Sequence, residues 1–160
     1  MKKITVESTL EVYDSLQELS KDIQNLMDRA IESRKKAYSP YSNFQVGVAL
    51  ILDNNKVITG NNQENASYPS GLCAERTAIY YAGSQFPNNQ ILKMAITASS
   101  KHKDTDKPIP PCGACRQAIL EYEIKQERPI EIYFMGKVGK VAKSDSIANL
   151  IPFIFDKNEL

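Results

Sequence analysis

The sequence predicts an α/β fold, a three-layer α/β/α arrangement around a mixed central sheet of about five strands. Strand-like runs alternate with helical runs, which favours a sheet covered by helices. An early pair of strand-like runs is joined by a short polar turn, so one part of the sheet is antiparallel and the sheet is mixed. The length of 160 residues predicts a single domain, residues 1–160, whose core needs no disulfide framework.

The first elements are an arm and a helix. Residues 4–13 alternate loosely between apolar and polar side chains, so residues 1–14 are expected to form an extended N-terminal arm. From 15 to 37 the apolar residues recur at helical spacing opposite a polar face. Pro40 marks the end of this helix, because the residue before a proline is driven out of the helical region.

The hairpin comes next. FQVGVALIL at 44–52 and KVITGNN at 56–62 are strand-like, and the turn Asp53–Asn55 separates them. The remaining expected elements are a helix over 73–82 stopped by Gly83, a strand over 91–99, a solvated loop over 100–111, a helix over 112–122, strands over 130–135 and 138–143, and a short helix from Ser144 or Asp145 to Leu150 closed by Pro152.

Composition excludes several classes of partner. The formal net charge is +1, so no overall field attracts nucleic acid or a membrane surface. No apolar run approaches the ~20 residues of a spanning helix, and MKKITVESTL contains no secretory apolar segment. Three cysteines are an odd number, which fits the reducing cytoplasm.

The strongest local motif is PCGAC, residues 111–115, at the expected start of a helix. Its two thiols lie three positions apart and therefore on one helix face. This spacing fits a redox pair, half of a zinc site or two structural cysteines. The motif alone does not choose among them.

A third cysteine favours zinc. Cys73 also starts an expected helix, so three thiolates can converge where two helix dipoles favour negative charge. Three protein ligands leave a fourth position for water, as in catalytic zinc sites. The only histidine, His102, lies in a charged loop and is expected to be exposed rather than a ligand.

Two charged residues follow Cys73. Glu75 is a candidate proton shuttle beside a metal-bound water, although a glutamate in a first helical turn is also an ordinary solvated residue. Three thiolates carry one charge more than Zn²⁺ neutralises, so a nearby cation is expected to donate to the sulfurs. We favour Arg76 over Arg116 for this role.

The combination of CAE with PCxxC resembles the zinc-dependent nucleoside and nucleotide deaminases. With cysteine in the first position it is most similar to cytidine deaminases of the small, three-cysteine, homotetrameric type. The similar segments stand in the family's order and are AYSPYSNFQVGVAL (37–50), NQENASY (62–68), CAERTA (73–78), PCGACRQ (111–117) and LIPFIF (150–155).

This resemblance implies hydrolytic deamination of cytidine and deoxycytidine, a reaction of pyrimidine salvage, with one zinc ion per chain. It also implies a homotetramer with shared active sites. The implied zinc ligands are Cys73, Cys112 and Cys115, and Glu75 is the implied proton shuttle. The implied substrate contacts are Phe44 against the pyrimidine, Asn62 and Glu64 on the ribose hydroxyl, the backbone of Ala74 on the pyrimidine carbonyl oxygen, and Phe155 stacking in a neighbouring subunit's site.

The sequence departs from the family pattern in three places. Residues 68–72 read YPSGL, which predicts a differently shaped loop before Cys73. Pro110 replaces a serine whose carbonyl faces the substrate amino group, and a proline keeps that carbonyl. The N-terminal arm lies outside the resemblance.

Three alternatives remain open. The same scaffold can deaminate another aminopyrimidine, such as a blasticidin-type antibiotic. The second alternative is a non-catalytic interaction module stabilised by zinc, and the third is a dithiol redox protein.

Overall fold

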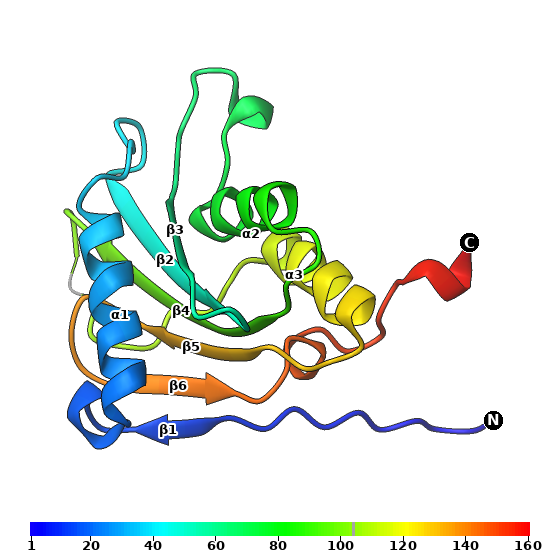
Figure 1. Cartoon of the computed structure of the whole chain (residues 1–160). Coiled ribbons are helices and arrows are strands. Elements are labelled where there is room, and N and C mark those ends of the chain that lie inside the picture. The colour runs from blue at the N-terminus through cyan, green and yellow to red at the C-terminus, as the bar shows by residue number, and fades with distance from the viewer. Residues whose placement is uncertain (104) are drawn as a thin grey trace.

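Figure 1 shows the computed structural model of the chain, which describes residues 1–103 and 105–160. One mixed sheet runs through it in the order β1-β6-β5-β4-β2-β3, in which only β4 and β5 are parallel neighbours. The strands are β1 (Glu11–Tyr13), β2 (Phe44–Leu52), β3 (Val57–Asn61), β4 (Ile91–Ser100), β5 (Glu131–Met135) and β6 (Val141–Ser144). The mixed α/β fold is thus confirmed, and the sheet has six strands rather than about five because the N-terminal arm contributes β1.

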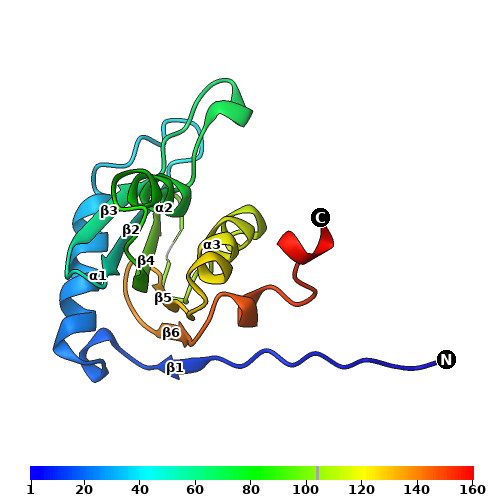
Figure 2. The same ribbon diagram turned by 45° about the vertical axis from the view of Figure 1, so that its right-hand side comes forward.

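Helices cover both faces of the sheet (Figure 2). Helix α1 (Lys21–Arg34) lies on one face, while α2 (Ala74–Gln85) and α3 (Gly113–Gln126) lie side by side on the other. Successive residues of a strand point to opposite faces, so β2 buries Ala49 under α1 and Val48 and Leu50 under α2 and α3. The three layers therefore enclose two apolar clusters, one on each face of the sheet.

The predicted helix over 15–37 is divided in the structure. A 3₁₀ turn at Leu16–Glu18 precedes α1, which ends at Arg34. The chain is extended at Leu19, where the backbone φ and ψ are −83° and 159°, and this break separates the two pieces. Leu19 is buried in the cluster under α1, so its apolar side chain contributes to the helical pattern from outside the helix.

Gly83 does not stop α2, which continues to Gln85. A Cβ atom at Gly83 would lie 2.4 Å from the Tyr122 hydroxyl in α3, so the glycine permits close packing of the two helices instead. The short helix predicted over 144–150 is reduced to a 3₁₀ turn at Ala148–Leu150. Ser144 donates its hydroxyl to the Ser146 carbonyl oxygen at 2.8 Å rather than capping a helix.

The remaining predicted elements are present with small shifts of their ends. β6 begins at Val141 rather than 138, because residues 137 and 138 donate their backbone N–H groups to the Thr105 carbonyl oxygen. In the predicted loop over 100–111, residue 104 lies outside the described residues. None of the described helices combines the length and hydropathy needed to cross a bilayer.

Candidate functional site

Three cysteine side chains meet at the N-terminal ends of α2 and α3. Cys73 directly precedes α2, Cys112 directly precedes α3, and Cys115 lies in the first turn of α3. The Sγ atom of Cys112 is 4.0 Å from that of Cys73 and 3.5 Å from that of Cys115. All three sulfurs lie within 4.8 Å of one another.

This spacing fits a zinc ion. A tetrahedral ion with Zn–S bonds of about 2.3 Å holds its sulfurs about 3.8 Å apart. The cysteines are free thiols, and Cys112 is exposed while Cys115 is buried, so the cluster is open on one side. Three thiols with an open side form the donor set of a site that leaves one zinc position for water or substrate.

The charges around Cys73 favour its thiolate form. The side chain accepts hydrogen bonds from Cys115 and from Arg76, whose Nη2 atom is 3.8 Å from the sulfur. These bonds outweigh the effect of burial and lower the pKa of Cys73 to about 5. Because zinc binds thiolates rather than thiols, this environment prepares Cys73 as a ligand.

Arg76 and Arg116 have different partners. Of these two arginines, only Arg76 donates to a sulfur among the described hydrogen bonds, and its buried Nε atom has no partner in the described part of the chain. Arg116 donates instead from Nε to the Pro111 carbonyl oxygen at 2.8 Å and from Nη1 to the Leu150 carbonyl oxygen at 2.7 Å. His102 is exposed and does not belong to the cysteine cluster.

Glu75 lies in the first turn of α2 and is only 4% exposed. Burial raises the pKa of its carboxyl group, because a charged carboxylate is poorly solvated there. A carboxyl group with a raised pKa can hold a proton at a pH closer to neutrality. Glu75 therefore has the properties of a group that both accepts and donates a proton.

A cavity of about 480 Å³ is lined by Glu75 and by two of the three cysteines, Cys73 and Cys112. β2 and β4 supply apolar side chains to its walls, and the segments before β2 and after β3 supply polar ones. The lining residues are Ser42, Phe44, Val46, Asn62, Glu64, Cys73, Glu75, Ile96, Ala98, Ile109, Pro110 and Cys112. A neighbouring depression of about 450 Å³ shares Ser42, Asn62, Glu64 and Cys73 and continues towards Tyr41, Tyr68 and Arg76.

Asn62 and Glu64 line both depressions. The Asn62 amide accepts from the Val46 N–H at 2.7 Å and donates to the Phe44 carbonyl oxygen at 2.9 Å, which leaves one lone pair and one N–H for a ligand. The Glu64 carboxylate accepts from the Tyr41 N–H at 2.9 Å and from the Ser42 hydroxyl. Burial would raise the pKa of Glu64, but these hydrogen bonds outweigh it and the net pKa is lowered.

The other predicted site residues lie apart from the cavity walls. Ala74 is fully buried at the first position of α2, where a backbone N–H has no partner within its own helix. Phe155 is 58% exposed, and its carbonyl oxygen accepts from Gln117 Nε2 at 2.9 Å. Its ring lines neither of the two depressions within the described residues.

Ser42 was missed by the sequence analysis although it lines both depressions and donates to Glu64. The only available signal was its position two residues before Phe44, at the entry to a strand that carries a predicted site residue. Ile109 was likewise missed, because the polar loop before PCGAC gives no indication that one of its apolar side chains turns towards the site.

Comparisons with known proteins agree with this geometry. Residues 20–127 match the family described as "Cytidine and deoxycytidylate deaminase zinc-binding region". The chain is 48% identical over 139 residues to a cytidine deaminase of Halalkalibacterium halodurans, covering 87% of this chain and 98% of that one. It is 34% identical to a cytidine deaminase of Sporosarcina psychrophila, covering 87% and 95% of the two chains.

Solved structures show the same likeness. The crystal structure of cytidine deaminase from Burkholderia pseudomallei superposes with a TM-score of 0.71 at 35% identity. The superposition covers 86% of this chain and all of the other, so the two proteins share most of the fold.

Proposed function

The chain belongs to the cytidine and deoxycytidylate deaminase family, and from this premise we propose that it hydrolyses cytidine and deoxycytidine to uridine and deoxyuridine with release of ammonia. One observation carries the proposal. A buried carboxyl group, Glu75, lines the same cavity as the thiols of Cys73 and Cys112. This juxtaposes a proton carrier with a zinc site inside a space large enough for a small ligand.

Cys73, Cys112 and Cys115 would hold one zinc ion, and the spacing of their sulfur atoms supports this assignment. When bound, zinc supplies a Lewis acid that lowers the pKa of a coordinated water molecule to about 7. Arg76 donates to the Cys73 sulfur and so reduces the excess negative charge of three thiolates.

Glu75 moves the protons of the reaction. Its carboxylate accepts a proton from the attacking water and donates it to the ring nitrogen beside the reacting carbon, which makes that carbon more electrophilic. A C–O bond forms at this carbon. Glu75 then carries the second proton of the water, which is now on the new C–OH group, to the exocyclic amine. The C–N bond breaks, ammonia leaves, and the oxygen remains as the carbonyl of the product. The raised pKa of Glu75 suits both transfers.

The walls of the cavity bind the nucleoside. Phe44 packs against the pyrimidine. At the ribose hydroxyl, the Glu64 carboxylate accepts a hydrogen bond and the Asn62 amide accepts or donates one. The Ala74 backbone N–H binds the pyrimidine carbonyl oxygen, and the Pro110 carbonyl faces the substrate amino group. Their position around one cavity supports these roles for Phe44, Asn62, Glu64 and Pro110.

The enzyme acts as a homotetramer of single-domain chains, each with residues 1–14 as an arm. Phe155 of one chain stacks on the base in a neighbour's site. This role is supported by the exposure of Phe155 and by its position outside the lining of its own chain's cavity. The ligands of the enzyme are nucleosides rather than nucleic acid or a membrane surface. It works in the reducing cytoplasm, where the thiols of Cys73, Cys112 and Cys115 remain available to zinc.

The experiment is a turnover assay on the zinc-loaded protein. Cytidine and deoxycytidine are each supplied while the loss of cytosine absorbance, ammonia release and zinc per chain are measured. We expect turnover with about one zinc per chain. Glu75→Gln should keep the zinc and lose about 100- to 10,000-fold in rate, whereas the exposed control Glu121→Gln should match the wild type.

Other results would overturn the proposal. Bound zinc without turnover of either nucleoside would favour another aminopyrimidine substrate or a non-catalytic zinc module. Retained turnover in Glu75→Gln would remove Glu75 from the mechanism. Reversible oxidation of Cys112 and Cys115 without bound metal would favour the dithiol redox protein.

A further inference from the structure

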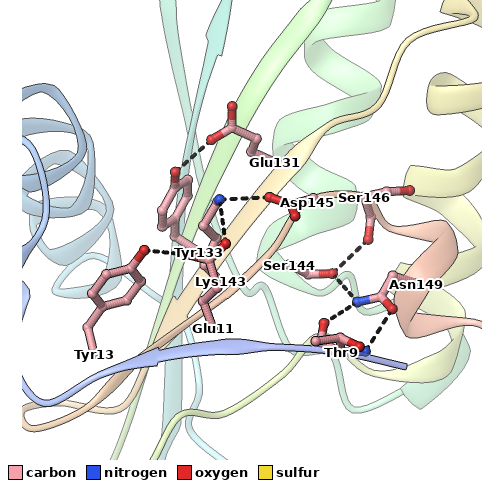
Figure 3. A network of polar contacts seen from close by, with 10 residues as sticks. All are labelled: Thr9, Glu11, Tyr13, Glu131, Tyr133, Lys143, Ser144, Asp145, Ser146 and Asn149. Carbon is pink, nitrogen blue, oxygen red and sulfur yellow. Dashed lines mark hydrogen bonds and ion pairs between the residues drawn. The ribbon is translucent and has the colours of Figure 1, made fainter. Parts of the chain in front are cut away.

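The N-terminal arm is fixed to the sheet at residues 8–14. The side-chain amide of Asn149 accepts from the Thr9 N–H at 3.0 Å and donates to the Thr9 carbonyl oxygen at 2.6 Å, as a neighbouring strand would (Figure 3). The Ser8 hydroxyl donates to the Asn149 carbonyl oxygen at 2.6 Å. These bonds place the arm at the outer edge of the sheet and fix its direction.

Charges on the arm strengthen this attachment. Lys143 in β6 lies directly opposite Glu11 in β1, and its Nζ atom is 3.0 Å from the Glu11 carboxylate and 2.7 Å from that of Asp145 (Figure 3). The Tyr13 hydroxyl donates to Glu11 at 2.6 Å. The N-terminal arm therefore departs from the folded domain at Ser8, at a well-defined position.

Residues 1–7, here called the free segment, have no such partners. In the part of the chain that the structure describes, no hydrogen bond or ion pair involves them, and in both views the chain runs outwards as an extended trace (Figures 1 and 2). Ile4 is 75% exposed and Val6 is 49% exposed. Two branched apolar side chains on one side of an extended strand favour burial against a partner.

The sequence of the free segment is complementary to itself. Residues 3–7 read KITVE, with a cation at one end, an anion at the other and apolar residues on either side of Thr5. In an antiparallel pair of two copies centred on Thr5, Lys3 faces Glu7 twice and Ile4 faces Val6 twice. Side chains that face each other across antiparallel strands lie on the same side, so charged and apolar pairs separate onto opposite faces.

We propose that the free segments of two copies of this chain pair as antiparallel strands in the register Lys3 to Glu7, Ile4 to Val6 and Thr5 to Thr5. The partner is a second copy because both the charge pattern and the apolar pattern match themselves. A two-stranded ribbon is only marginally stable alone, so this pairing rests on the proposed homotetramer for its other contacts between copies. It does not depend on the reaction that the chain catalyses.

Cross-linking tests the register. In the proposed pair the two Thr5 Cα atoms lie about 4.5–5.5 Å apart, within the range for a disulfide. The full-length, zinc-loaded Thr5→Cys variant should therefore form a covalent dimer under a mild oxidant. Ser8→Cys is the matched control, because two copies of residue 8 would be separated by six residues of strand, or about 20 Å.

Charge exchange tests the pairing itself within the Thr5→Cys background. Lys3→Glu or Glu7→Lys alone places like charges opposite each other twice and should slow cross-linking about tenfold. The double exchange Lys3→Glu with Glu7→Lys restores opposite charges and should restore the rate. Wild-type protein controls for reaction of the native cysteines.

Two results would overturn the proposal. Equal cross-linking of Thr5→Cys and Ser8→Cys would show that the free segments have no fixed register. If the double variant cross-links as slowly as the single variants, residues 3 and 7 do not face each other. This result is expected if the free segment pairs instead with an edge strand of the partner's sheet. A deaminase assay of the same samples reports on the proposed function separately.

Discussion

The carboxylate of Glu123 accepts a hydrogen bond from the backbone N–H of Ile147, 24 residues later in the chain, at 3.0 Å. It also accepts from the N–H groups of Ile130 at 2.8 Å and Ala148 at 3.2 Å. One buried side chain in α3 thus holds the entry to β5 and the turn that follows β6.

Removal of this carboxylate should be costly. Glu123→Ala leaves the backbone N–H groups of Ile130 and Ile147 without a partner, whereas that of Ala148 keeps the Ser146 hydroxyl oxygen at 3.0 Å. Each buried unsatisfied group costs about 1–3 kcal/mol, so we expect the free energy of unfolding, measured by chemical denaturation, to fall by about 2–6 kcal/mol. Glu121→Ala, on the exposed face of the same helix, should stay within about 0.5 kcal/mol of the wild type. Equal losses for the two variants would contradict this.

Arg76 should matter for rate more than for folding. Its hydrogen bond to Cys73 offsets the negative charge of the thiolates, so Arg76→Gln is expected to lower kcat/KM or zinc affinity about 10- to 100-fold. Steady-state kinetics and a competitive chelator titration measure the two quantities. The exposed Arg29→Gln serves as the control with the same change of charge. Wild-type values for both quantities in Arg76→Gln would leave the arginine without this role.

Substitution by alanine should have different effects on the free energy of unfolding at two glycines. A Cβ atom at Gly47 in β2 would lie 2.2 Å from the Ala30 carbonyl oxygen of α1, so Gly47→Ala forces the helix away from the sheet. Overpacking of this kind costs about 1–3 kcal/mol in the free energy of unfolding. Gly113 at the start of α3 has open space around its Cβ position, and Gly113→Ala should be neutral or stabilising. Thermal unfolding of the two variants distinguishes these cases.

The ionisation of the Glu64 carboxyl group should make the stability of the folded chain depend on pH. Its pKa is lowered in the folded chain, so its contribution to stability is complete above the unfolded-state value near 4.5 and is lost as pH falls through the lower folded value. We expect the difference in Tm between the wild type and Glu64→Gln to be constant above about pH 5.5 and to shrink at more acidic pH. A difference that stays constant down to pH 3 would contradict the prediction.

The sequence predicted the parts of the site that depend on local chemistry. Cys73 and Cys112 both stand immediately before helices that pack together, and a helix start can be read from short-range pattern. Glu75 follows Cys73 by two residues, so its place in the first turn was fixed once the helix was assigned. The mixed α/β order followed from alternating periods in the same way.

Long-range partners could not be predicted. The short run at Glu11–Tyr13 forms a strand because β6 offers it an edge, and no local signal identifies that partner. Glu123 resembles a solvated helix residue in sequence, yet it is buried because three N–H groups from later segments converge on it. Gly83 has the pattern of a helix stop, and only the approach of Tyr122 from another helix explains its position.

The attachment of Thr9 to Asn149 spans 140 residues, so the arm cannot take its place at the edge of the sheet until Asn149 has been made. At a translation rate of about 5–20 residues per second, the arm waits roughly 7–28 s for Asn149 to be made. During that interval the KITVE segment is exposed on an unfinished chain. Because a two-stranded ribbon is only marginally stable alone, two such segments can pair only once the folded chains supply further contacts.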